Sequence, residues 1–245
     1  MIINLVLAII AYKLKALNTK AIILAYVIGV VILFSCFEAY ILLLVYFITV
    51  LIVEKILLNS KKEKRSSIQV LANIVFAFVA LIFYILKDES KYFVIYCCML
   101  SVSLCDTLSS TVGTRLAKKV YSITKLKMIS NGISGGVSFV GSFAGFTGSL
   151  FLASIYLTIA YITKAEVSTT SFMIIWFSGF TGMIIDSILG DVLQKKYQCV
   201  ICGKVKDTKD CCGSNCQSIG ISLLTNTQVN IISEGIVFVI LLLIL

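Results

Sequence analysis

The sequence has no histidine and no proline among its 245 residues, and only 13% of them are charged. Without histidine, a general base must be a carboxylate, a lysine, a cysteine or bound water, and a metal site must use oxygen or sulfur ligands. Without proline, no helix kink depends on that residue. A soluble domain has about 25% charged residues, so the scarcity of charge argues against a fold that lies wholly in water.

What the sequence does contain is apolar: 59% of its residues are hydrophobic and its mean hydropathy is +1.04. One water-soluble core could not bury so large an apolar fraction, so we expect an integral membrane protein. Despite the net charge of +9 we expect no nucleic-acid partner, because the cations lie in short connections between apolar segments. The chain starts apolar at Met1 without a cationic leader, which predicts a first membrane segment and not a removed signal peptide.

Eight apolar segments follow one another through the chain, and most have the ~20 residues needed to cross the hydrocarbon core of a membrane. None alternates strictly between apolar and polar residues, so strands are disfavoured. The sequence predicts an all-α, polytopic membrane helix bundle that forms one domain, residues 1–245, with about eight transmembrane helices. Seven helices with a re-entrant segment are the alternative. The predicted segments are 1–16, 21–37, 39–58, 68–86, 92–112, 133–162, 170–190 and 228–245.

Cationic residues alternate between the connections of these segments. The first, third, fifth and seventh connections carry three, five, five and five of the 21 lysines and arginines, whereas the charges of the fourth and sixth cancel. Loops rich in lysine and arginine stay in the cytoplasm. The pattern therefore predicts that both termini lie outside, and that polar motifs beside the odd-numbered connections face the cytoplasm.

Two aspartates lie within apolar segments near these predicted cytoplasmic ends. Asp106 is followed by hydroxyl residues that include Thr107 and Ser110, and Asp186 stands between two glycines. A carboxylate in a membrane helix is costly and indicates function, and hard oxygen ligands suit Mg²⁺. We predict that Asp106 and Asp186 hold magnesium; a solvated helix-end aspartate and an aspartate–lysine pair are the alternatives. Asp191 is expected to be solvated.

A glycine cluster stands just before the sixth apolar stretch. It consists of Gly132, Gly135 and Gly136, and follows a loop with five cations. Free backbone N–H groups at a helix N-terminus bind anionic oxygens, so the cluster predicts a phosphate cradle that opens the sixth helix; close helix packing is the alternative. Three later glycines recur at helical spacing and are assigned to packing. They are Gly141, Gly145 and Gly148.

Polar side chains occur in two further groups with helical spacing. Arg65, Gln69 and Asn73 are four residues apart, and so are Asn226 and Asn230 at the start of the last segment. Residues four apart share one helix face. Since a buried amide needs a partner, the amides are predicted either to bind a nucleotide or phosphate, or to hydrogen-bond to a neighbouring helix.

The nine cysteines fall into two groups. Four lie in or beside apolar segments, where they are expected to pack as small residues. The other five lie in residues 195–220, a predicted cytosolic loop where reducing conditions disfavour disulfides. Their CxxC spacing fits a structural Zn²⁺ site with four thiolates; an unliganded loop and redox chemistry are the alternatives. The assigned ligands are Cys199, Cys202, Cys212 and Cys216, with Cys211 as the alternative to Cys212.

Taken in order, the polar motifs resemble the integral-membrane family of domain of unknown function 92, also called the transmembrane protein 19 family, which includes the plant phytyl-phosphate kinase. The resemblance covers about residues 60–235. The chain departs from the family pattern at Thr111, where an acid is usual, at Ile133-Ser134 and at Thr225. A lysine that precedes the family's glycines is nearest to Lys127. The matching stretches are 65–73, 106–113, 132–138, 186–194 and 226–230.

The resemblance implies a membrane kinase that phosphorylates an isoprenoid monophosphate with CTP or another nucleoside triphosphate. Asp106 and Asp186 would then hold Mg²⁺, while Arg65 and Lys127 would neutralise charge on the reacting oxygens. A lipid or small-molecule transporter or flippase and a non-catalytic membrane scaffold are the alternatives; nucleotide binding and flux into vesicles would separate the three. The other implied binding residues are Gln69, Asn73, Thr107, Ser110, Gly132, Gly135, Gly136, Asn226 and Asn230.

Overall fold

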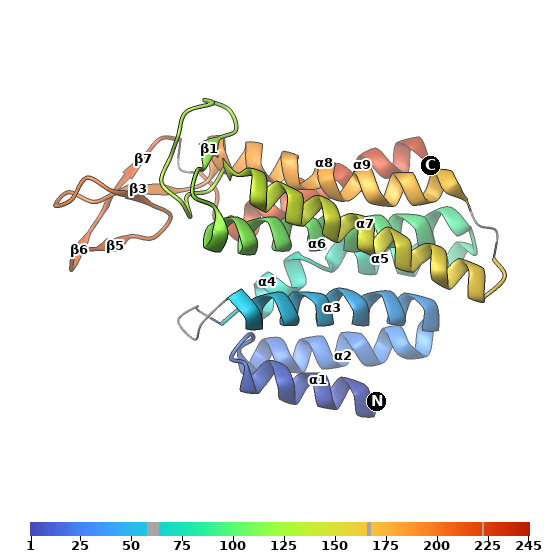
Figure 1. The fold of residues 1–245 in the computed structure, drawn as a ribbon. Helices are drawn as coiled ribbons and strands as arrows, with labels where there is room; N and C mark the ends of the chain where they lie inside the picture. Colours follow the sequence, from blue (N-terminus) through green and yellow to red (C-terminus); the bar gives the residue numbers. More distant parts are fainter. Residues whose placement is uncertain (58–63, 166–167, 222) are drawn as a thin grey trace.

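The chain forms a helix bundle that carries short strands at one end (Figure 1). The computed structural model describes residues 1–57, 64–165, 168–221 and 223–245, and within them it confirms the predicted all-α, polytopic bundle. The helices are α1 (Ile2–Lys13), α2 (Thr19–Ser35), α3 (Phe37–Leu57), α4 (Ser67–Ala72), α5 (Val75–Lys87), α6 (Ser90–Leu116), α7 (Phe139–Ile162), α8 (Thr169–Leu193) and α9 (Asn226–Ile244).

Each of the eight predicted apolar segments contains helix, but not each is a full span. Among the described residues, α3, α6, α7, α8 and α9 are long and apolar enough to cross a membrane, whereas α1, α2 and α5 are shorter. The fourth segment breaks at Asn73–Ile74 into α4 and α5. The sixth starts at Phe139 and not at residue 133, because Gly136 and Val137 pair as a strand.

Short polar residues fix where most helices begin. Asn18, Ser138 and Ser168 each accept a hydrogen bond from a backbone N–H of the following turn. Ser66 and Thr225 form capping boxes, in which the glutamine three residues later bonds back to the cap. Such caps satisfy N–H groups that have no partner inside the helix.

Helix α6 is the most buried of the long helices and forms the centre of the bundle. The glycines of α7 let the backbones of α6 and α7 approach closely. A Cβ atom at Gly141 would lie 2.7 Å from the carbonyl oxygen of Ser109, and one at Gly145 would lie 2.8 Å from that of Cys105. The packing role predicted for Gly141, Gly145 and Gly148 is confirmed.

Both termini lie at one end of the bundle, and the α6–α7 and α8–α9 connections lie at the other (Figure 1). In the α6–α7 connection, β1 pairs with β2. In the α8–α9 connection, β4, β3 and β7 form a three-stranded sheet, and β5 pairs with β6. The predicted cations Lys61 and Lys62 and the acid Glu166 lie outside the described residues. The strands are β1 (Tyr121–Ser122), β2 (Gly136–Val137), β3 (Lys196–Gln198), β4 (Val205–Lys206), β5 (Asp210–Cys211), β6 (Ser214–Asn215) and β7 (Gln217–Ile219).

Candidate functional site

A polar cavity of about 720 Å³ opens at the end of the bundle that carries these two connections. Its volume is typical of a small-molecule site. It is lined by α4 and the two residues Lys64 and Arg65 before it, by α6, α7, α8 and α9, by the α6–α7 connection and by part of the α8–α9 connection. The structure thus brings together motifs from five separate parts of the sequence. The predicted site residues that line it are Arg65, Gln69, Asn73, Asp106, Thr107, Ser110, Gly132, Gly135, Gly136, Asp186, Asn226 and Asn230.

The cavity reaches well into the bundle, and the two predicted acids lie in it. Asp106 is ten residues before the end of α6, which is about 15 Å at the helical rise per residue. The carboxyl groups of Asp106 and Asp186 lie within hydrogen-bonding distance of each other. The Ser233 hydroxyl donates to Asp186 Oδ1 at 3.0 Å. Asp186 therefore has a serine neighbour, while its closest charged neighbour is another acid.

Sequence reasoning missed a third acid in this cluster. Glu234 of α9 is 4% exposed and interacts electrostatically with Asp106 and Asp186. Within the described residues, its Oε2 atom has no hydrogen-bond partner. An unpaired buried carboxylate is costly, so three clustered acids call for a cation. The signal was available, because an acid inside an apolar membrane segment indicates function.

The same cluster bears on the departure at Thr111. Thr111 lines the cavity where the family pattern has an acid, and its Oγ1 atom has no partner among the described residues. Glu234, from a different helix, adds a carboxylate beside the Asp106–Asp186 pair. The cluster therefore has three carboxylates, although Thr111 replaces the acid that is usual at that position.

Arg65 supplies positive charge to the cavity and is held from both sides. Its guanidinium forms a 2.8 Å ion pair with Glu54 of α3. Its backbone bonds to Ala16 and Asn18 in the α1–α2 connection. The charge of Arg65 also acts favourably on Asp106. The four-residue spacing predicted that Arg65 and Gln69 share a helix face. Arg65 precedes α4, so they do not share one, yet both residues line the cavity.

The amide residues have structural partners as well as a place in the cavity wall. The Gln69 side chain accepts from the Ser66 backbone N–H at 2.8 Å, as part of the capping box that begins α4. Asn73 is the C-cap that follows Ala72, the last residue of that short helix, where α4 breaks from α5. Asn226 and Asn230 stand one turn apart at the start of α9 and also line the cavity.

The glycine cluster does not open a helix, which corrects the prediction. Gly132 and Gly135 have φ values of +85° and +77°, which favour glycine, and Gly136 belongs to β2. The backbone N–H and the hydroxyl of Ser134 both donate to Asp207 of the α8–α9 connection. A carboxylate therefore occupies the turn that was expected to hold phosphate.

Asp207 joins the cysteine-rich connection to the cavity. It lines the cavity, and its Oδ1 atom has no partner among the described residues. Gln194 Nε2 donates to its other oxygen at 3.3 Å. Burial raises the pKa of Asp207, and the bonds from Ser134 partly oppose that rise.

Asp191 is buried, which corrects the expectation that it would be solvated. Its carboxylate accepts hydrogen bonds from Ser122 and Thr124 of the α6–α7 connection and forms a 2.9 Å ion pair with Lys196. A Cβ atom at Gly135 would collide with Asp191. Asp191 therefore fastens the α6–α7 connection to the end of α8.

Lys127 is the one predicted catalytic residue that the structure leaves away from the cavity. It is exposed in the α6–α7 connection, where its backbone oxygen accepts from the Ser122 N–H at 2.9 Å. Among the described residues, the cations in the cavity wall are Lys64, Arg65 and Arg115.

Four cysteines gather in the α8–α9 connection. The sulfur atoms of Cys199, Cys202, Cys211 and Cys212 all lie within 4.8 Å of one another. Sulfur atoms bound tetrahedrally at 2.3 Å are about 3.8 Å apart, and the Cys202–Cys211 and Cys211–Cys212 separations are 3.7 and 3.8 Å. Backbone N–H groups of Cys202 and Ile201 and the neighbouring thiols lower the pKa of Cys199 to about 6, which favours its thiolate.

This set differs from the predicted one by a single residue. Cys211 and Cys212 both belong to it, and Cys216 does not, although Cys216 interacts with Cys199. The difference arises because a tight turn places two adjacent cysteines on one side; Cys212 has a φ of +53°.

Comparisons with known proteins agree with this architecture. Residues 2–238 match the family described as "Integral membrane protein DUF92". The chain is 27% identical to an uncharacterized membrane protein of Methanocaldococcus jannaschii, MJ0933, over 78% of this chain and 80% of that protein. No solved structure matches the chain.

Two relatives match over shorter stretches. An uncharacterized membrane protein of Synechocystis, sll0875, is 30% identical over 42% of this chain and 38% of its own length. The Arabidopsis thaliana "Protein VTE6, chloroplastic" is 36% identical over 26% of this chain and 19% of its own length. The family match covers nearly the whole chain, and the protein is a member of the DUF92 family of integral membrane proteins.

Proposed function

We propose that the protein is a phosphotransferase that transfers the terminal phosphoryl group of a nucleoside triphosphate, such as CTP, to an isoprenoid monophosphate. The convergence of Asp106 and Asp186 beside Arg65, in one polar cavity, is the observation that carries the proposal. The cavity lies at the end of the bundle with the cation-rich connections, and the positive-inside rule assigns that end to the cytoplasm, where the nucleotide is dissolved.

The chemistry needs little covalent help from the protein. An oxygen of the acceptor phosphate attacks the γ-phosphorus, the bond from that phosphorus to its bridging oxygen breaks, and a nucleoside diphosphate leaves. The acceptor oxygen is already anionic, so a chain without histidine lacks nothing that the reaction requires. Positioning and charge neutralisation dominate such transfers.

The residues in the wall divide this work. Arg65, held by Glu54, would bind an anionic oxygen of the acceptor. Lys64 and Arg115, which also line the cavity, would meet the phosphates of the nucleotide. The amides of Asn226 and Asn230 and the hydroxyls of Thr107 and Ser110 would orient the nucleotide; these lie in α9 and α6.

The acid cluster fits a magnesium ion. Three clustered carboxylates, of which the buried Glu234 has an unpaired oxygen among the described residues, repel one another unless a cation lies between them. Asp106 and Asp186 would hold the ion, and Glu234 would add negative charge beside them. The ion would neutralise charge on the phosphates during transfer.

The test is a direct assay of the purified protein in lipid nanodiscs. With Mg²⁺, CTP and a prenyl monophosphate we expect a prenyl diphosphate and CDP in equal amounts. The matching prenyl alcohol should give no product, because its hydroxyl carries no charge to bind Arg65. Absence of diphosphate with every common nucleoside triphosphate, together with absence of nucleotide binding, would contradict the proposal.

We also propose that the four clustered cysteines bind a structural zinc ion. The protein purified without chelators is expected to contain about one zinc per chain, since four thiolates fill a tetrahedral site. Cys202→Ser should lose most of that zinc, measured as metal content, because three thiolates bind far more weakly than four. Cys36→Ser, at the α2–α3 junction, is the matched control and should keep it. Equal zinc in both variants would remove the site.

A further inference from the structure

Glu234 belongs to the acid cluster but is not in the wall of the polar cavity. It lies on α9 eight residues after Asn226, which is about 12 Å along the helix at 1.5 Å per residue. Asn230, one turn before it on the same face, lines the cavity, whereas Val237 and Phe238, the next residues on that face, belong to the apolar core. The polar face of α9 therefore ends at Glu234, deeper in the bundle than the cavity wall.

The ionisable neighbours of Glu234 among the described residues are acids like itself. Its side chain is buried, and Asp106 of α6 and Asp186 of α8 act on it electrostatically. The neighbouring Ser233 hydroxyl donates to Asp186 Oδ1 at 3.0 Å, which holds α9 against α8 at this depth. No hydrogen-bond donor of the described residues reaches Glu234 Oε2. A buried carboxylate without a partner is costly, so its position calls for a positively charged ligand.

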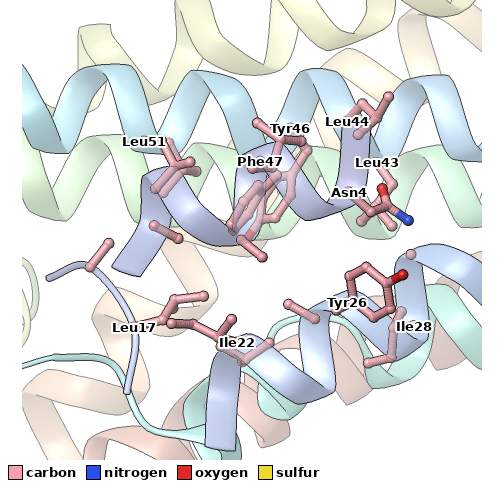
Figure 2. Close-up of a pocket in the computed structure, with 18 of the residues that line it drawn as sticks. Asn4, Leu17, Ile22, Tyr26, Ile28, Leu43, Leu44, Tyr46, Phe47 and Leu51 are labelled. Carbon is pink, nitrogen blue, oxygen red and sulfur yellow. The ribbon is translucent and has the colours of Figure 1, made fainter. Parts of the chain in front are cut away.

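Arg65 does not balance this cluster. It brings one positive charge to three acids, and its guanidinium is already paired with Glu54 at 2.8 Å. Glu54 needs that partner, because it lies at the edge of a small, mostly apolar pocket of about 100 Å³ between α1, α2 and α3. Figure 2 shows the apolar side chains around this pocket, such as Ile22 of α2 and Phe47 of α3. The charge of Arg65 is therefore shared, and the acid cluster keeps a net negative charge.

We propose that Asp106, Asp186 and Glu234 bind one divalent cation before any nucleotide enters the cavity, with Glu234 as a direct ligand. The inference rests on the proposed function and deepens it, because the phosphotransferase would then hold a resident ion as well as any ion that arrives with the nucleotide. Carboxylates from three helices offer the hard oxygen ligands that Mg²⁺ prefers. A divalent ion offsets two of the three negative charges, whereas a monovalent ion offsets one.

Manganese tests the site without turnover, because electron paramagnetic resonance distinguishes bound from free Mn²⁺. Nucleotide-free protein in nanodiscs of uncharged lipid should bind about one Mn²⁺ per chain. Glu234→Gln keeps the shape of the side chain and removes its charge. It should weaken Mn²⁺ binding at least about tenfold, since the loss of even an outer partner of a metal site costs about 10- to 100-fold in affinity.

The matched control makes the same chemical change at the other end of the bundle. Glu38→Gln, at the start of α3, should leave Mn²⁺ binding unchanged (Figure 1). Absence of bound Mn²⁺ without nucleotide, or equal affinity in the Glu234 and Glu38 variants, would overturn the proposal.

Thermal unfolding in detergent separates a lost ligand from a damaged fold. Without metal, Glu234→Gln should unfold at the same or a higher temperature than the wild type, because it removes one of three clustered acids. Mg²⁺ should raise the unfolding temperature of the wild type, since it binds the folded state, and should not raise that of Glu234→Gln. A less stable metal-free variant, or an equal Mg²⁺ effect on both proteins, would show that Glu234 is structural and would overturn the proposal.

The cation site and the phosphotransferase can fail separately. A protein that binds Mn²⁺ through Glu234 but forms no prenyl diphosphate would contradict the phosphotransferase and keep the cation site. A protein that forms the diphosphate but binds no Mn²⁺ without nucleotide would keep the phosphotransferase and overturn the cation site.

Discussion

Replacing Asp106 by asparagine is expected to lower the rate of diphosphate formation by at least about 100-fold, as for loss of one preorganised charge-stabilising group. Asparagine keeps the shape of the side chain and removes its negative charge. Under the proposed mechanism the Asp106–Asp186 pair would then hold a divalent cation poorly, and the phosphates would repel each other during transfer. The measurement is the initial rate of diphosphate formation at saturating CTP and Mg²⁺.

Two comparisons separate a loss of chemistry from a loss of structure. Asp88→Asn, in the α5–α6 connection at the opposite end of the bundle, should leave the rate unchanged, because asparagine also tolerates the φ of +54° found there. The Asp106 variant should unfold at the same or a higher temperature in detergent, since clustered acids destabilise a fold. An unchanged rate in the Asp106 variant would place the reaction elsewhere.

Replacing Asp191 by alanine is expected to lower the free energy of unfolding by about 3–5 kcal/mol, the usual cost of leaving a buried ion without its partner. The side chain of Asp191 is 3% exposed and that of Lys196 15% exposed. The variant also removes the acceptor for Ser122 and Thr124. Denaturant unfolding measures the loss, and faster hydrogen exchange in residues 117–138 should accompany it.

The exposed Lys91–Glu89 pair provides the matched control for that prediction. Glu89→Ala removes an acid from an ion pair of the same length, 2.9 Å, but in solvent, and should leave unfolding unchanged. In the Lys196→Met background, Asp191→Ala should cost much less, since the partner is already absent. Equal losses in both backgrounds would show that the ion pair contributes nothing.

The helical segments could be predicted from the sequence because membrane spans depend on local composition. Hydropathy found all eight apolar segments, and alternating charge found the end at which the polar motifs meet. The break at Asn73 could not be found in this way, because neither proline nor glycine marks it. Gly136 was misassigned to a helix, because its strand partner Ser122 lies fourteen residues earlier and pairing is not a local property.

The candidate site could be predicted in part. Asp106 and Asp186 could be identified because a carboxylate in an apolar membrane segment is costly, and both line the cavity. The same rule applied to Glu234 would have found the third acid. Asp191 could not be understood from its own segment, since Ser122 and Thr124 lie almost 70 residues away in the chain. Lys127 was chosen because it is nearest to a lysine that precedes the family's glycines, and sequence position says little about where a side chain in a loop points.

Asp207 links the position of the cysteine-rich connection to the contents of the cavity, because it lines the cavity and accepts hydrogen bonds from Ser134. A phosphate that entered the turn at Ser134 would have to displace this carboxylate, so ligand occupancy and loop position draw on one shared equilibrium. Such coupling is reciprocal. Whatever loosens the cysteine cluster should therefore alter how tightly such a phosphate would bind, and a bound phosphate should alter the position of the cysteine-rich connection in return.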